Sequence, residues 1–119
     1  MEHKNLSFRQ RLGFAMNGIR AAYRTEKSLR VQAVAALLLL PFLAATRPSA
    51  LWCAVLVAMA AFVVCLELVN TAVESVLDKL HPGKDEAIGF AKDCLAGAVL
   101  VASLASVLVF LLYVFAELF

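Results

Sequence analysis

The sequence predicts an all-α membrane protein in which an N-terminal amphipathic helix on the membrane surface precedes three transmembrane helices. Two observations predict this fold. Apolar residues make up 63% of the 119 residues and the mean hydropathy is +0.86, whereas roughly half of a soluble domain is apolar. In addition, residues 31–46, 50–66 and 94–116 carry no charged side chain. We expect residues 1–119 to form a single integral membrane domain.

The first element, at about residues 6–27, shows the periodicity of an amphipathic helix. Its apolar side chains are Phe8, Leu12, Ala15, Ile19, Ala22 and Tyr23, and its basic ones are Arg9, Arg20, Arg24 and Lys27. This pattern is typical of a helix that lies in the membrane interface. A short helix that packs on the bundle is a compatible alternative.

The three spans are predicted at about residues 29–47, 50–78 and 93–117. A bilayer core of about 30 Å requires roughly 20 helical residues, so the first span needs Leu29 and Arg30 in addition to its uncharged stretch. The segment Arg47-Pro48-Ser49 predicts a tight turn between the first two spans. Pro82 and Gly83 end the second, and residues 85–93 look like a short helical segment before the third.

The basic residues predict the orientation, because cytoplasmic loops are rich in Lys and Arg. Seven precede the first span: Lys4, Arg9, Arg11, Arg20, Arg24, Lys27 and Arg30. Lys79, Lys84 and Lys92 lie between the second and third spans. We therefore expect the N-terminus and residues 79–93 in the cytoplasm and the C-terminus outside. The basic excess suits anionic lipid better than nucleic acid.

At the outer ends of the helices we expect Trp52 and Tyr113 to anchor at the membrane interface. Glu117 is expected to be solvated there.

A row of polar residues continues the second apolar stretch: Glu67, Asn70, Glu74 and Asp78. On a helix all four project within a sector of roughly 80°. Ionised groups near a membrane boundary are costly unless they are paired, hydrated or bound to metal. The row therefore requires an explanation, and the predicted topology places Glu26, Arg30, Lys92 and Asp93 at about the same depth.

These residue types can support phosphoryl transfer. Carboxylate and amide oxygens suit Mg²⁺, Lys92 offers a point charge for phosphate, and a further carboxylate is a candidate general base. Spacing alone does not decide which acid is ligand and which is base. The sequence has no G-x-x-x-x-G-K-[ST] loop. An acid-lined ion or proton pathway and a structural subunit with interhelical salt bridges remain alternatives.

Three helices cannot enclose a large polar pocket alone. We therefore expect copies of the chain to complete the site together, as a homo-oligomer.

Three strings resemble the prokaryotic diacylglycerol kinase family, which includes undecaprenol kinases. They are Glu67-Leu-Val-Asn70-Thr-Ala-Val-Glu74-Ser-Val-Leu-Asp78, then Ala91-Lys92-Asp93 with Ala96-Gly97-Ala98-Val99-Leu100, and Gly18-Ile-Arg20-Ala-Ala-Tyr23 with Glu26. The resemblance covers nearly the whole chain. It implies a homotrimeric kinase of the bacterial inner membrane, with its active site facing the cytoplasm. Its partners would be ATP, Mg²⁺ and a membrane lipid, not nucleic acid.

The resemblance also implies a role for each residue of the site. Glu67 would take the proton from the lipid hydroxyl, and Glu26 and Glu74 would hold Mg²⁺ against the ATP phosphates. Asn70, Lys92 and Asp93 would position nucleotide and phosphate, with Asp78 towards the nucleoside. The lipid would be bound by Arg20, Arg30 and Glu67.

The expected acceptor is diacylglycerol, giving phosphatidic acid, and undecaprenol is the alternative. The resemblance separates these branches at the segment Arg30-Val31-Gln32. The first branch tends to carry Arg-Gln-Glu there, and the second has histidine at position 32. Gln32 matches neither branch, so this segment leaves the choice of lipid open.

Overall fold

The computed structural model describes residues 5–119, and over this range the chain is helical apart from its turns. Lys4, which we counted among the basic residues, lies outside the described residues. The elements are α1 (Phe8–Thr25), α2 (Lys27–Thr46), α3 (Ala50–Leu80), α4 (Glu86–Tyr113) and a terminal π-helical turn, η1 (Val114–Leu118). Three segments are long and apolar enough to cross a membrane: Lys27–Thr46, Ala50–Leu80 and Glu86–Leu118. The predicted all-α membrane fold is confirmed.

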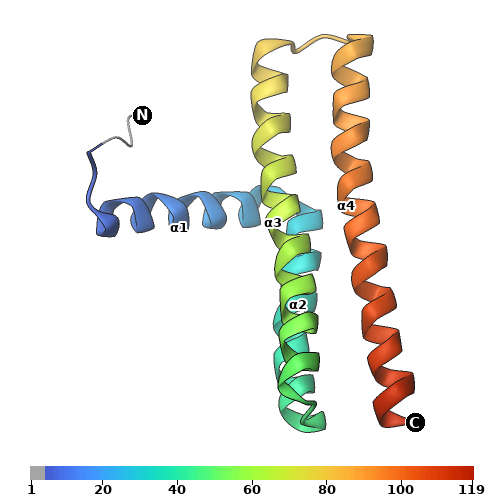
Figure 1. Ribbon diagram of the computed structural model, residues 1–119. Helices are drawn as coiled ribbons and strands as arrows, with labels where there is room; N and C mark the ends of the chain where they lie inside the picture. Colours follow the sequence, from blue (N-terminus) through green and yellow to red (C-terminus); the bar gives the residue numbers. More distant parts are fainter. Residues whose placement is uncertain (1–4) are drawn as a thin grey trace.

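Helix α1 lies across the direction of the other helices (Figure 1). It begins with a capping box. The backbone N–H of Gln10 donates to Ser7 Oγ, and the backbone N–H of Ser7 donates to the side-chain oxygen Oε1 of Gln10. Most large apolar side chains of α1 are exposed (Phe8, Leu12, Met16, Ile19 and Tyr23), Phe14 is half-buried, and Ala22 is buried. The chain therefore leaves most of the apolar side of α1 uncovered, as expected of a helix that lies on a membrane.

A sharp corner separates α1 from α2. Glu26 has an extended backbone (φ −112°, ψ 110°), which ends α1 and lets α2 begin at Lys27, two residues before the predicted start. Arg30 Nη1 donates to the carbonyl oxygens of Tyr23 and Arg24, each at 2.9 Å. These carbonyls belong to the last turn of α1, which has no helical partners for them. Arg30 thus stabilises the corner between α1 and α2.

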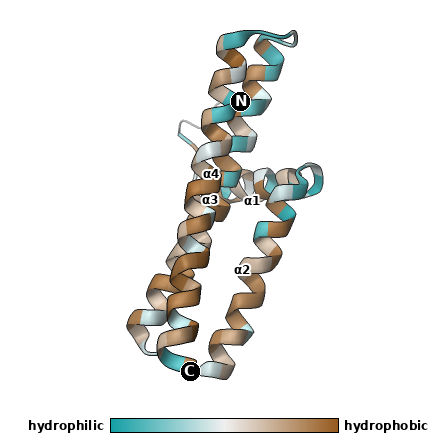
Figure 2. Ribbon diagram, turned by 90° about the vertical axis from the view of Figure 1, so that its right-hand side faces the viewer, coloured by the Kyte–Doolittle hydropathy of each residue, from teal (hydrophilic) through white to brown (hydrophobic). Residues whose placement is uncertain are grey.

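Helices α3 and α4 form a long hairpin that continues past α1 (Figure 1). Helix α3 has 31 residues, a length of about 46 Å, which exceeds the roughly 30 Å hydrocarbon core. The expected helical segment at residues 85–93 is continuous with α4, because the Asp85 side chain caps that helix by accepting from the Ile88 amide. Hydrophilic residues gather at the tip of this hairpin and on α1, and the rest of the bundle is mainly hydrophobic (Figure 2).

The buried cluster of the bundle lies at its opposite end and centres on Tyr113. This side chain is 0% exposed and packs with Leu43 and Leu56. Its hydroxyl donates to Thr46 Oγ1 at 2.7 Å, which ties α4 to α2. The expectation that Tyr113 anchors at the lipid interface is therefore wrong for this chain, because neighbouring helices enclose the ring.

A second contact joins the N-terminal end of α3 to η1. Trp52 Nε1 donates to Glu117 Oε1 at 3.1 Å. Glu117 is exposed, which agrees with the expectation that it is solvated, and it also accepts this bond from α3.

Candidate active site

The site is organised around Glu67, which is the one charged side chain that is buried among the described residues, with 3% exposure. Its carboxylate accepts a hydrogen bond from Ser28 Oγ, with 3.0 Å between Ser28 Oγ and Glu67 Oε2. Ser28 lies in the first turn of α2, so this bond fixes Glu67 at the level of the α1–α2 corner. Glu67 therefore lies at the same level of the bundle as the amphipathic helix α1.

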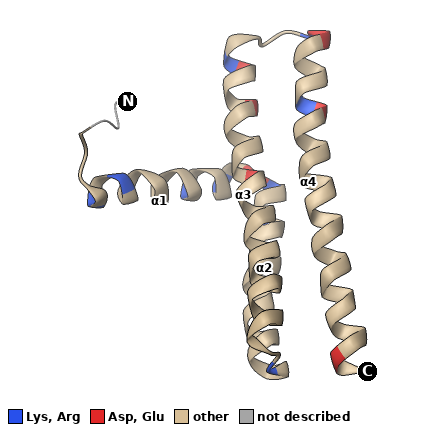
Figure 3. Ribbon diagram, in the orientation of Figure 1, with Lys and Arg blue, Asp and Glu red and all other residues tan. Residues whose placement is uncertain are grey.

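The other members of the polar row lie further along α3, at increasing distance from this corner. At a rise of about 1.5 Å per residue, Asn70, Glu74 and Asp78 lie about 4.5, 10 and 16 Å beyond Glu67 along the helix axis. Acidic positions follow one another up α3 in this way (Figure 3). We predicted a common depth for the polar residues. The structure instead distributes them from the α1–α2 corner to the tip of the hairpin, because α3 and α4 are longer than a membrane span needs to be.

Asn70 carries an unpaired group. Its Oδ1 atom is buried and has no hydrogen-bond partner, a situation that costs free energy unless a ligand supplies the missing interaction. Glu74 follows one helical turn later and is half-buried. An amide oxygen and a carboxylate on the same side of a helix are hard donors that suit Mg²⁺, whose remaining positions are commonly filled by phosphate and water. The two residues therefore fit a metal–phosphate ligand.

The second cluster of the site lies towards the tip of the hairpin, where Lys92 Nζ and Asp78 Oδ1 form an ion pair. Glu74 also acts electrostatically on Lys92. The side chains of Lys92 and Asp78 are 36% and 62% exposed, and ion pairs between solvent-exposed side chains contribute little to stability. Lys92 can therefore exchange Asp78 for a phosphate at little cost. Asp93 is exposed beside it.

Other residues of the predicted site remain apart within one chain. Glu26 is half-buried at the corner and makes no side-chain capping bond. In the described part of the chain, no three His, Cys, Asp or Glu side chains converge as a metal site. Arg20 is exposed on α1 and donates to Asn17 Oδ1 at 3.4 Å.

Ser28 is a residue of the candidate site that the sequence analysis missed. Its bond to Glu67 joins residues 39 positions apart, and no motif includes it. The one signal was its place two residues after Glu26, at the start of the first span.

The chain is similar to known diacylglycerol kinases. The sequence model described as prokaryotic diacylglycerol kinase matches residues 13–114. A diacylglycerol kinase of Synechocystis sp. is 37% identical over 98 residues, which cover 81% of this chain and 55% of that protein. One of Escherichia coli K12 is 31% identical over 96 residues, covering 81% and 79%, and one of Haemophilus influenzae is 29% identical over 92 residues, covering 75% of each. The chain thus spans little more than half of the Synechocystis relative.

Proposed function

Because the chain belongs to the prokaryotic diacylglycerol kinase family, we propose that it is a membrane lipid kinase that transfers the γ-phosphate of Mg²⁺-bound ATP to the hydroxyl of diacylglycerol. The products are phosphatidic acid and ADP. The observation that carries this proposal is the buried Glu67 carboxylate, held by Ser28 at the level of the interfacial helix. A carboxylate at that depth meets the hydroxyl of a lipid headgroup.

Glu67 acts as the general base of the transfer. Its Oε2 atom is held by Ser28, which leaves Oε1 to accept the proton of the lipid hydroxyl. A base oriented by a third group is the usual arrangement for activating a hydroxyl nucleophile. The hydroxyl oxygen forms a bond to the γ-phosphorus, the bond from that phosphorus to the β–γ bridging oxygen breaks, and ADP leaves.

The nucleotide binds along the α3–α4 hairpin. Asn70 and Glu74 face the phosphates with Mg²⁺, which enters as part of the Mg²⁺–ATP substrate and neutralises phosphate charge. Glu26 would add a second carboxylate from the corner. Lys92 and Asp93 position the phosphates. Asp78, about 16 Å beyond Glu67, then lies towards the nucleoside.

We propose different roles for the two arginines that the resemblance assigns to lipid binding. Arg20 is exposed on α1, where it can meet anionic headgroups. Arg30 is bonded to carbonyls of α1, so we propose that it keeps α1 at the level of Glu67 and supports the lipid site in that way.

The proposed topology places the N-terminus and the hairpin tip in the cytoplasm of a bacterial inner membrane, with the C-terminus outside. Lys79, Lys84 and Lys92 on the hairpin support this orientation. We further propose a homotrimer. A single chain leaves Glu74 and Lys92 half-buried and Asp78 exposed, and a neighbouring copy would close this face. Light scattering of the purified protein–detergent complex tests the trimer, and a monomeric mass would refute it.

The test of the kinase is transfer of labelled γ-phosphate from ATP to lipid in mixed micelles that contain diacylglycerol, undecaprenol or ceramide. Wild-type protein is expected to label diacylglycerol best, and preferential labelling of undecaprenol would identify the alternative branch. Glu67→Gln is expected to abolish turnover, because the amide cannot accept the proton. Glu117→Gln is the matched control at the outer end and should retain full activity. An active Glu67→Gln protein would remove Glu67 as the base.

An ion or proton conduit is the competing function. A conduit needs polar groups across the membrane, but residues 50–66 and 94–116 carry no charge. We therefore expect no nucleotide-independent proton flux when the protein is reconstituted in liposomes.

A further inference from the structure

A basic patch without an ionic partner lies along α1 (Figure 3). The helix contains no acidic residue, and all of its basic residues are exposed: Arg9, Arg11, Arg20 and Arg24. The ion pairs found within residues 5–119 both lie towards the tip of the α3–α4 hairpin. Helix α1 therefore has a net charge of +4, from four arginines and no acid, and no ion pair in the described part of the chain neutralises it.

The arginines border the apolar side of α1. By helical rotation, the five exposed apolar side chains of this helix fall in a sector of roughly 80°. Arg9 and Arg20 lie about 20° and 40° beyond one edge of this sector, and Arg11 lies about 60° beyond the other. Arginine side chains are long enough to keep their charge at the headgroups while their stems lie along hydrocarbon. With the apolar sector in the bilayer, these guanidinium groups lie among lipid phosphates, so α1 fits an anionic leaflet.

The proposed reaction changes the charge of that leaflet. Diacylglycerol is neutral, whereas phosphatidic acid is a phosphate monoester, and such groups carry a charge of about −1.5 to −2 at pH 7. ADP leaves into water, but the new phosphate stays in the membrane beside α1. Each basic side chain near an anionic leaflet strengthens membrane binding about fivefold. The product is therefore an anionic lipid that the enzyme itself supplies to the surface on which α1 lies.

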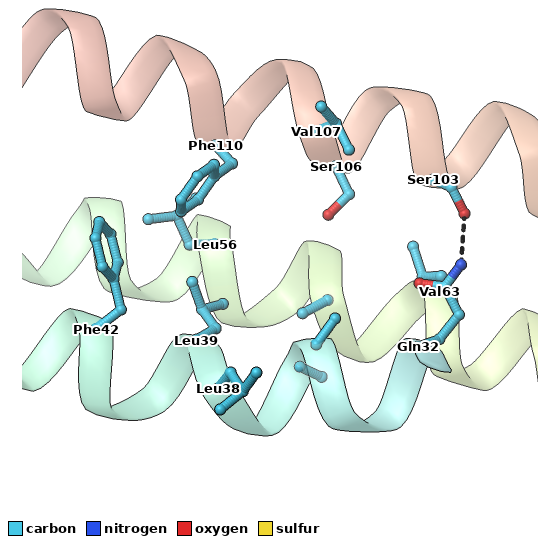
Figure 4. Close-up of a pocket in the computed structure, with 13 residues that line it drawn as sticks. Gln32, Leu38, Leu39, Phe42, Leu56, Val63, Ser103, Ser106, Val107 and Phe110 are labelled. Carbon is cyan, nitrogen blue, oxygen red and sulfur yellow. Dashed lines mark hydrogen bonds between the residues drawn. The ribbon is translucent and has the colours of Figure 1, made fainter. Parts of the chain in front are cut away.

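The position of α1 affects the site through Glu26, the residue that joins α1 to α2. Helix α2 is bound to the bundle independently of α1. Its Ser28 donates to Glu67 of α3, and one turn later Gln32 Nε2 donates to Ser103 Oγ of α4 at 3.3 Å (Figure 4). Glu26 has an extended backbone between the two helices. A movement of α1 is therefore taken up at Glu26, whose carboxylate is proposed to meet Mg²⁺.

We propose that α1 binds phosphatidic acid through its arginines and that the product thereby activates the enzyme. On a neutral leaflet only the apolar side keeps α1 on the membrane, so Glu26 is fixed less firmly. As product accumulates, the arginines bind the leaflet more strongly, Glu26 stays in place and turnover rises. This inference rests on the proposed kinase function and adds to it the way in which the site is regulated.

Amide hydrogen exchange of α1 tests the binding step without phosphoryl transfer. The full-length protein is reconstituted without ATP in nanodiscs of phosphatidylcholine, alone or with a minor fraction of phosphatidic acid. An amphipathic helix derives most of its stability from burial of its apolar side, so its amides exchange when it leaves the surface. Phosphatidic acid is expected to slow exchange in residues 8–25, and soluble glycerol 3-phosphate is expected to have no effect. Equal exchange in both membranes, or protection by the soluble phosphate, would overturn the proposal.

The double variant Arg9→Gln, Arg11→Gln isolates the charge, because both side chains are exposed and neither belongs to the proposed active site. With phosphatidic acid present, its α1 amides are expected to exchange roughly 25-fold faster than those of wild type, a factor of about five per arginine. In neutral discs the two proteins should exchange alike. Arg9→Lys, Arg11→Lys keeps the charge and should behave as wild type, as should Arg47→Gln at the opposite end of α2. Wild-type protection of the double glutamine variant would overturn the role of the arginines.

Progress curves in phosphatidylcholine vesicles that contain diacylglycerol test the regulatory step. Wild type is expected to accelerate as product forms, and vesicles that contain phosphatidic acid from the start should show the full rate at once. The double glutamine variant should begin at the wild-type rate and not accelerate. An active wild type whose rate only declines would overturn activation by product and leave the kinase function intact. Protection of α1 by phosphatidic acid in a protein that transfers no phosphate would support the binding step and refute the kinase function.

Discussion

Replacing Ser28 by alanine tests the central geometric claim, that one hydrogen bond orients the catalytic carboxylate. Ser28 Oγ lies 3.0 Å from Glu67 Oε2, and Glu67 is 3% exposed, so water cannot easily replace the lost donor. Hydrogen bonds to charged groups contribute about 1.5–3 kcal/mol. If this contribution is expressed in the transition state, the rate falls roughly 10- to 100-fold.

The assay is steady-state phosphorylation of diacylglycerol in mixed micelles, with KM for ATP measured in parallel. Ser28→Ala is expected to lower kcat by this factor and to leave KM for ATP unchanged, because the nucleotide residues lie further along α3. Ser28→Thr keeps the hydroxyl and should restore most of the rate. Ser75→Ala, on an exposed face of α3, is the control for a serine-to-alanine change.

Two results would refute this reasoning. A Ser28→Ala protein with wild-type kcat would show that Glu67 needs no orienting donor. A loss that Ser28→Thr does not restore at all would assign the effect to helix packing rather than to the hydroxyl.

Three further predictions concern the corner, the nucleotide cluster and the outer end. Lys92→Ala is expected to raise KM for ATP about tenfold with little effect on KM for lipid, because it removes a phosphate-binding charge; an unchanged KM for ATP would contradict this role. Arg30→Ala removes two hydrogen bonds to carbonyls of α1 and should increase amide hydrogen exchange in the last turn of α1, whereas wild-type protection there would show that the corner holds without it. Tyr113→Phe removes the bond to Thr46 and should lower the free energy of unfolding by about 1 kcal/mol, seen as a lower thermal midpoint with unchanged kcat; an unaltered midpoint would show that the bond adds no stability.

The sequence predicts the helices well, because membrane burial requires long uncharged stretches and helix formation follows from them. It also predicts which polar residues share one side of α3, since helical rotation alone determines that relation. The predicted ends of the helices were less accurate. The start of α4 depends on the Asp85 side-chain cap, which lies outside the uncharged stretch that marked the third span. The distribution of charge and hydropathy along the sequence therefore defines the spans but not the ends of the helices.

The depth of the site residues could not be read from the sequence. Charge-free stretches suggested that all polar residues lie at one boundary, but helix continuity carries α3 to Leu80 and starts α4 at Glu86. The site is consequently extended, with Glu67 at the corner and the Lys92–Asp78 pair near the tip of the hairpin. An elongated site suits a nucleotide that approaches from one side and a lipid from the other.

The sequence by itself determined the membrane class, the number of spans and the polar row on α3, because these depend on composition, length and helical periodicity. Only the tertiary structure decided which helix each side chain meets. The bonds Ser28–Glu67, Gln32–Ser103 and Tyr113–Thr46 join residues 39, 71 and 67 positions apart. Their formation depends on how α2, α3 and α4 pack, and periodicity within one helix carries no information about that packing.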